Sequence, residues 1–136
     1  NRFDIGLITS RLIAATNFVL KNPKWRGLKL GYFGASTGSA AAIQAATVMP
    51  VSAVVSRGGR PDLAGQYLDK LKVPVLLIVG SLDTEVIVLN KVAYGRISCK
   101  KELAIVTGAT HLFEEPGTLE KAARLAADWF VKHFKM

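Results

Sequence analysis

The sequence has little cysteine, no long apolar run and no recognisable leader. Cys99 is the single cysteine in 136 residues, so no internal disulfide can form, which favours a reducing compartment and a cytoplasmic location. No apolar run approaches the about 20 residues that a membrane helix needs, and we expect no membrane association. Residues 1–4 lack an initiating Met and are not followed by a signal-peptide core. We therefore expect the chain to begin within a domain.

Acidic residues are also scarce, and the imbalance leaves a formal charge of +8. A basic chain can attract nucleic acid, anionic lipid or an acidic substrate. The basic residues are scattered, with the densest groups within residues 21–29 and at Lys100 and Lys101. No basic run is interleaved with aromatic residues, and no nucleic-acid motif is present. The pattern indicates a solubilising surface and predicts no nucleic-acid partner.

Apolar residues are abundant, since 50% of the chain is hydrophobic and 21% is charged, which is typical of a globular domain. Their spacing predicts helices over residues 4–20, 36–48, 61–71, 84–97 and 118–134, and strands over 28–33, 52–56, 73–79 and 102–106. The run 73–79 is apolar almost throughout, which indicates a strand buried on both faces of a parallel sheet. We therefore predict a single α/β domain over residues 1–136, a three-layer sandwich around a mainly parallel sheet with one strand for each of these runs.

The first and last predicted helices carry apolar stripes. In the first, capped by Asp4, the expected buried positions are Ile5, Ile8, Leu12, Ala15 and Val19. In the last they are Leu119, Ala122, Ala123, Leu125, Ala126, Trp129, Phe130 and Phe134. His133, near the end of that helix, is expected at the surface or as a partner of the helix dipole.

Gly34-Ala35-Ser36-Thr37-Gly38 matches the pattern G-x-S-x-G between a predicted strand and a predicted helix, the context of a nucleophile elbow. Such a turn is tight and strained, so the neighbours of the nucleophile must be small, as Gly34, Gly38 and residues 39–42 are. The turn would raise the Ser36 hydroxyl above the sheet and point the Thr37 backbone N–H toward a developing oxyanion. The five-residue pattern alone also arises by chance.

Two further polar residues follow predicted strands. Asp83 comes directly after the strand 73–79, at the edge where active sites of parallel sheets form, although it could instead cap the helix that begins at Thr84. His111 lies in the loop after the last strand. The order Ser36, Asp83, His111 is that of α/β-hydrolases, and the spacing leaves no room for a lid domain.

Together these residues predict nucleophilic catalysis. His111 would take the proton from Ser36, Asp83 would fix the imidazole tautomer and offset its charge, and Ser36 would attack an ester carbonyl. Two other carboxylates could be the acid: Asp62, which follows the strand after the elbow, and Glu85, which is expected on the next helix.

Three other residues have alternative interpretations. Arg57 and Arg60 lie in a glycine-rich loop at the same edge, where they could bind a substrate carboxylate or phosphate. They could equally pair with Asp62, Glu114 or Glu115, and the sequence leaves both possibilities open. Cys99 is presented by no turn motif, so it is interpreted as a structural or surface thiol rather than a nucleophile.

The segments 31–42, 55–64 and 108–117 resemble the dienelactone-hydrolase-like branch of the α/β-hydrolase superfamily, including hydrolase domains fused to phosphoribosyltransferase domains. The resemblance covers essentially the whole chain. It implies Ser36, Asp83 and His111 as the catalytic triad, the Thr37 N–H in the oxyanion hole, and small esters or lactones as substrates. It implies no metal and no cofactor.

The chain departs from that family by starting one helix before the elbow, whereas complete members have several more strands there. The missing part normally supplies a second oxyanion donor, whose loss can cost about 10²–10³ in rate. The elbow strand would also keep an unpaired edge. We therefore expect a homodimer, with elbow strands paired antiparallel into one continuous sheet or with helices near the elbow packed together. The alternative function is a non-catalytic hydrolase-like module that binds a partner.

Overall fold

Strands and helices alternate along the chain in the computed structural model, which describes residues 4–25 and 27–135. The helices are α1 (Ile5–Lys21), α2 (Gly38–Ala46), α3 (Tyr67–Lys70), α4 (Thr84–Arg96) and α5 (Thr118–Phe134), with a 3-10 turn, η1 (Pro61–Ala64), before α3. The strands are β1 (Gly31–Ala35), β2 (Ala53–Arg57), β3 (Val75–Gly80) and β4 (Lys101–Val106).

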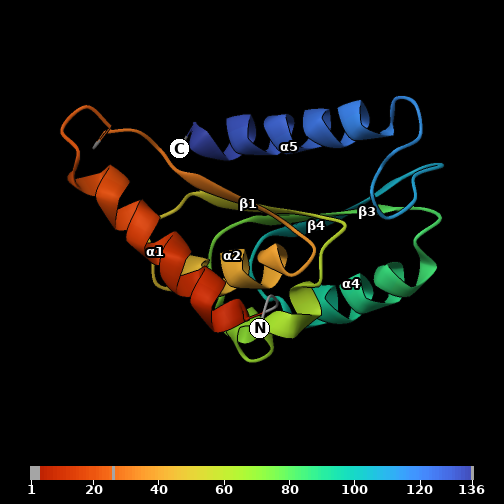
Figure 1. The fold of residues 1–136 in the computed structure, drawn as a ribbon, viewed down its shortest axis with the longest axis horizontal. Coiled ribbons are helices and arrows are strands. Elements are labelled where there is room, and N and C mark those ends of the chain that lie inside the picture. The colour runs from red at the N-terminus through yellow and green to blue at the C-terminus, as the bar shows by residue number, and fades with distance from the viewer. Residues whose placement is uncertain (1–3, 26, 136) are drawn as a thin grey trace.

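The four strands form one parallel sheet in the order β1-β2-β3-β4. Each crossover advances one strand in the same direction, and right-handed crossovers of this kind place their helices on the same face. Accordingly α1, α2 and α4 cover one face of the sheet, whereas α5 is the one described helix on the other (Figure 1). The predicted α/β fold with a parallel four-stranded sheet is confirmed.

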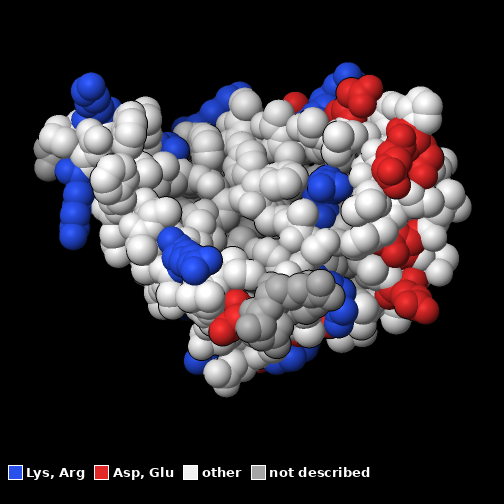
Figure 2. Space-filling model, viewed as in Figure 1, with Lys and Arg blue, Asp and Glu red and all other residues white. Residues whose placement is uncertain are grey.

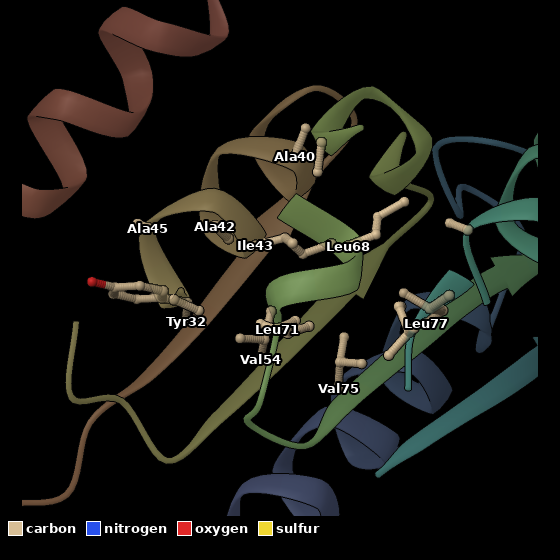
Figure 3. Close-up of a cluster of buried hydrophobic side chains, with 14 of the residues drawn as sticks. Tyr32, Ala40, Ala42, Ile43, Ala45, Val54, Leu68, Leu71, Val75 and Leu77 are labelled. Atoms are coloured by element: carbon tan, nitrogen blue, oxygen red, sulfur yellow. The ribbon is translucent and has the colours of Figure 1, made fainter. Parts of the chain in front are cut away.

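Alternating side chains of the central strands build a core on each face. Val54, Val75 and Leu77 pack with Ile43 of α2 and Leu68 of α3 (Figure 3). The intervening residues of the same strands face α5. All six residues of β3 are buried, which explains why its sequence is apolar throughout. The carboxyl ends of β1, β2, β3 and β4 therefore meet at one edge of a sheet covered on both faces.

Helix α1 begins as predicted, because the Asp4 carboxylate accepts a hydrogen bond from a first-turn N–H. Its buried stripe agrees with the prediction only in part: Ile5 and Leu12 pack against the core, but Ala15 is exposed and the buried residues are Thr9 and Thr16. Each threonine hydroxyl lies 2.7 Å from the carbonyl four residues earlier, and Thr16 also bonds the Tyr32 hydroxyl at 2.6 Å. Hydroxyls satisfied in this way can be buried, so the inward face of α1 includes polar residues that an apolar pattern does not predict.

The predicted helix over residues 61–71 is wrong, because the structure divides it into η1 and α3. Gly65 lies between them at φ +55°, a conformation that ends a right-handed helix. The elbow strand begins and ends later than predicted, at Gly31 and Ala35, and α2 begins only at Gly38. The intervening residues Ser36 and Thr37 form the turn itself.

The inward face of α5 agrees with the prediction at Ala122, Ala126 and Trp129, which are buried, and differs from it elsewhere. Leu119 and Ala123 are exposed, and the buried positions after Thr118 recur at four- and three-residue spacing: Ala122, Ala126, Trp129 and His133. His133 is only 6% exposed and stacks edge-on against Trp129, with ring centroids 4.3 Å apart. Burial, with help from Lys100 and Lys132, lowers the pKa of His133. The ring is therefore buried and favours its neutral form, so the expected surface or dipole role is wrong.

Lysine and arginine side chains are separated by uncharged surface on the face seen in Figure 2. The basic group at residues 21–29 includes Arg26, which lies outside the described residues. Within the ranges 4–25 and 27–135, no helix has the length and apolar character required to cross a membrane.

Candidate active site

Ser36 occupies a strained turn between β1 and α2, with φ +50°. A positive φ is uncommon for any residue other than glycine and costs free energy unless the surroundings hold it. Two backbone N–H groups do so by donating to the Ser36 carbonyl, from Ser39 at 3.2 Å and from Arg60 at 3.0 Å. The turn therefore has the form of a nucleophile elbow, with the serine at its tip.

The two glycines of the G-x-S-x-G pattern are not equivalent. A Cβ on Gly34 would lie 2.6 Å from the Gly38 carbonyl oxygen and 2.9 Å from the Ser39 Cα, both backbone atoms. A Cβ on Gly38 would meet no atom within 4 Å. The chain returns so closely over β1 that Gly34 has no room for a side chain. The expectation that Gly38 must also be small for packing is wrong.

Three loops bring a hydroxyl, an imidazole and a carboxylate together at the carboxyl edge of the sheet. Ser36 Oγ lies 3.3 Å from His111 Nε2, and His111 Nδ1 lies 2.7 Å from Asp83 Oδ2. The short Nδ1 contact with a carboxylate favours the tautomer with its proton on Nδ1. Nε2 then carries the lone pair that faces the serine. The His111 side chain is 41% exposed and that of Asp83 is 14% exposed, so the imidazole is open to a small molecule.

The three candidate acids have different surroundings in the structure. Asp83 occupies the N-cap position of α4 but its side chain makes no capping bond; it binds His111 instead. Asp62 is held by Arg60 through two hydrogen bonds of 3.0 Å. Glu85 is exposed in the first turn of α4. Only Asp83 of the three contacts His111.

The loop that carries His111 is fastened by contacts that the sequence did not indicate. The Glu115 carboxylate accepts from the Thr110 backbone N–H at 3.0 Å and from its hydroxyl at 2.6 Å. The Thr110 side chain and backbone N–H lower the pKa of Glu115 in that order of importance. Ser81 Oγ accepts from the Gly108 N–H at 2.8 Å, which joins this loop to the one that carries Asp83. The sequence indicated Glu115 only as a possible arginine partner, because a threonine five residues before a glutamate is not a recognised motif.

Thr37 directly follows the serine and is the N-cap residue of α2. Backbone N–H groups at the start of a helix have no intrahelical partner and carry the positive end of its dipole. The Thr37 N–H is thus a candidate donor to an anion next to Ser36. Within the part of the chain that the structure describes, no three His, Cys, Asp or Glu side chains are grouped so that they could bind a metal.

The two arginines of the loop after β2 have different partners. Arg60 forms the fork-like pair with Asp62, which raises its pKa. The Arg57 guanidinium lies 5.2 Å from the centre of the Phe113 ring. No carboxylate among the described residues pairs with Arg57. The pairing interpretation therefore holds for Arg60, and Arg57 is the less engaged of the two.

Cys99 lies before β4, at the amino edge of the sheet and opposite the Ser36 edge. Its Sγ donates to the Val73 carbonyl at 3.2 Å. Burial raises the pKa of the Cys99 thiol, which favours the unreactive thiol form. The structure thus agrees with the interpretation of Cys99 as a structural residue.

Comparison with known proteins gives close relatives. The dienelactone hydrolase of Anabaena variabilis has 52% sequence identity and a TM-score of 0.96, with 98% of this chain and 62% of that chain covered. Proteins of two Mycobacterium tuberculosis strains, each named "Putative phosphoribosyl transferase", are 55% identical over 135 residues. This chain spans only 30% of the length of those relatives. An esterase domain from Rhodothermus marinus shares the fold, with a TM-score of 0.80 at 18% identity.

The family model described as "Dienelactone hydrolase family" matches residues 3–136, nearly the whole chain. The same residues superpose on a solved dienelactone hydrolase at high identity. The chain belongs to the dienelactone hydrolase family.

Proposed function

We propose that the protein is a serine hydrolase of small esters or lactones that acts through Ser36, His111 and Asp83. The single observation that carries the proposal is the line of contacts from the Ser36 hydroxyl through the His111 ring to the Asp83 carboxylate, 3.3 and 2.7 Å long. A serine–imidazole distance at the upper end of the hydrogen-bond range is common before substrate binds. We further propose a cytoplasmic location, because the lone Cys99 makes no disulfide.

The proposed reaction follows from these positions. His111 Nε2 takes the Ser36 proton as Ser36 Oγ attacks the ester carbonyl, and the Asp83 carboxylate stabilises the imidazolium. The Thr37 N–H donates to the tetrahedral oxyanion. When the C–O bond breaks, His111 returns the proton to the leaving alkoxide and an acyl-serine remains. Water, deprotonated by His111, attacks the acyl-serine, and the acid leaves as the proton returns to Ser36. In a lactone, alcohol and acid stay in one molecule.

Residues around the line of contacts bear on the substrate. Leu82 and Leu112, the sequence neighbours of Asp83 and His111, are 60% and 62% exposed. They offer an apolar rim to the carbon skeleton of a small ester. Arg57 and Arg60 are proposed to bind a carboxylate or phosphate of the substrate. Arg57 is the stronger candidate, because the Arg60 guanidinium is already paired with Asp62. The name of the Anabaena relative, a dienelactone hydrolase, supports lactones as the substrate class.

Covalent labelling tests the proposal directly. A fluorophosphonate probe is expected to lose fluoride and bond to Ser36 Oγ. Trypsin should release residues 30–57 in one peptide, which also contains Ser39, Ser52 and Ser56. These three serines are an internal control, because fragmentation of the labelled peptide assigns the probe to one serine. No labelling, or a probe on any serine other than Ser36, would contradict the proposal and favour a non-catalytic module.

We also propose that two copies of the protein pair along β1. Within the described residues β1 is hydrogen-bonded only to β2, so one edge keeps unpaired backbone groups. Phe33 in β1 is 51% exposed, and Phe18 and Leu28 nearby in the chain are 68% and 61% exposed. A largely apolar groove of about 230 Å³ lies between α1 and β1. A second copy related by a two-fold axis presents the same edge and groove. Each copy can therefore pair the free backbone groups of the other and cover its exposed apolar side chains.

Light scattering after size exclusion tests this pairing at micromolar protein concentration. The wild-type protein is expected to have the mass of a dimer, and Phe33→Lys is expected to give a monomer because it places a charge at the proposed seam. Val131→Lys is the matched control, since Val131 is 57% exposed on α5 and should leave the dimer intact. A wild-type protein that elutes as a compact monomer would overturn the proposed pairing.

A further inference from the structure

Asn90 is a buried polar residue that the proposed reaction does not use. It lies in the middle of α4 and is fully buried. Its Nδ2 donates to the Val86 carbonyl at 2.8 Å and to the Gly59 carbonyl at 3.0 Å. Both partners are acceptors, which fixes the orientation of the amide. Its Oδ1 is buried without a partner among the described residues. A leucine there would avoid that unsatisfied oxygen but would leave the Gly59 carbonyl without this donor, so the asparagine is tied to its contact with the loop.

The contact with Gly59 links Asn90 to the Ser36 turn, because one peptide group bonds to both. The Gly59 carbonyl and the Arg60 N–H belong to one planar peptide unit. The Arg60 N–H donates to the Ser36 carbonyl at 3.0 Å. Asn90 and Ser36 thus hold opposite sides of one peptide plane. Rotation of this plane breaks both hydrogen bonds together.

Neighbouring groups restrict the position of the Gly59–Arg60 peptide. One residue earlier, the Gly58 N–H donates to the Ile78 carbonyl at 2.7 Å, and Gly58 has φ +55°. A Cβ on Gly59 would collide with the hydroxyl oxygens of Ser39 and Ser56. The peptide between Gly59 and Arg60 therefore runs close over the buried start of α2. The hydrogen bond from Asn90 to the Gly59 carbonyl restrains the remaining motion, rotation of the peptide plane.

We propose that Asn90 is a positioning residue, which orients the Gly59–Arg60 peptide and thereby holds the strained Ser36 turn within reach of His111. This inference rests on the proposed function, since it assigns a purpose to the position of Ser36. Helix α4 then serves the site at two places. Asp83 at its N-cap holds the imidazole, and Asn90 two turns later holds the loop behind the serine.

The test uses Asn90→Leu and, because leucine is larger than asparagine, also Asn90→Ala. Ala93→Gly is the matched control, since Ala93 is buried in the same helix, packs in the apolar core with Ile43 and Leu68, and has no polar side-chain group that could hold the loop. For both Asn90 variants we expect kcat for p-nitrophenyl acetate to fall by about tenfold to a hundredfold with KM unchanged, as a small displacement of a reacting group can produce. Ala93→Gly should lower the melting temperature and leave kcat unchanged.

A second measurement separates this inference from the proposed function. The hydrogen-exchange rate of the Arg60 amide, relative to that of Leu77 in β3, should rise at least about tenfold in both Asn90 variants and not in Ala93→Gly, because loss of a restraint exposes the amide locally. A wild-type protein without esterase activity would overturn the proposed function, and the exchange ratio would still test the peptide link. An unchanged ratio would overturn the link, and a raised ratio with unchanged kcat would overturn its positioning role.

Discussion

Replacement of Ser36 by alanine is expected to reduce hydrolysis of p-nitrophenyl acetate to the background rate, a loss of about 10⁴-fold to 10⁶-fold where the wild-type rate permits that range to be measured. The variant retains the loops and His111 but has no hydroxyl to acylate. Its stability should change little, because the Ser36 Oγ makes one side-chain contact, the 3.3 Å contact with His111. The measurement is the initial rate per mole of folded protein, with the melting temperature of each variant recorded.

Two controls make this result specific. Ser98→Ala removes an exposed hydroxyl far along the chain and should leave the rate unchanged. Asp83→Asn keeps the shape of the acid but favours the wrong imidazole tautomer, and a loss of about 10⁴-fold is expected. If Ser36→Ala retained a tenth or more of the wild-type rate, another group would carry the hydrolysis and the proposed role of Ser36 would be wrong.

Replacement of Gly34 by alanine is expected to destabilise the protein by about 3 kcal/mol or more and to abolish labelling of Ser36, because overpacking against rigid backbone is costly. The added Cβ would lie 2.6 Å from the Gly38 carbonyl oxygen and 2.8 Å from its carbon. Neither atom can move unless the start of α2 moves away from β1. That motion would also displace Ser36, so stability and reactivity should be lost together in denaturant unfolding and probe labelling.

Gly38→Ala is the matched control within the same motif. A Cβ at Gly38 meets no atom within 4 Å, and alanine is favoured over glycine in a helix by about 1 kcal/mol. This variant is therefore expected to be at least as stable as the wild-type protein and to be labelled at a similar rate. Equal damage from both substitutions would show that the steric argument for the first glycine is wrong.

Much of the fold was predictable because it depends on local patterns. The continuous apolar run of β3 indicated burial on both faces, and all six of its residues are buried. The errors arose where polar groups found partners or where one residue changed the backbone. Thr9 and Thr16 are buried because their hydroxyls bond carbonyls of their own helix. Gly65 divides the predicted third helix, and His133 is buried against Trp129.

The candidate site was also predictable only in part from the sequence. The order of Ser36, Asp83 and His111 after three strands predicted that they share one edge, since parallel strands end together. The sequence could not decide which carboxylate reaches the imidazole, because Asp62 and Asp83 both follow strands. The structure shows which one does: Asp83 contacts His111, whereas Asp62 is paired with Arg60.

The sequence by itself determined the chain of elements, the glycine-serine turn and the edge of the sheet on which the polar residues gather. These depend on backbone preferences and hydrophobic periodicity, which act within about one turn or one strand of each residue. Only the tertiary structure decided that Asp83 rather than Asp62 contacts His111, and that Asn90 points inward to the Gly59 carbonyl. Such contacts join residues distant in sequence, and they depend on how the strands register and twist when the sheet forms.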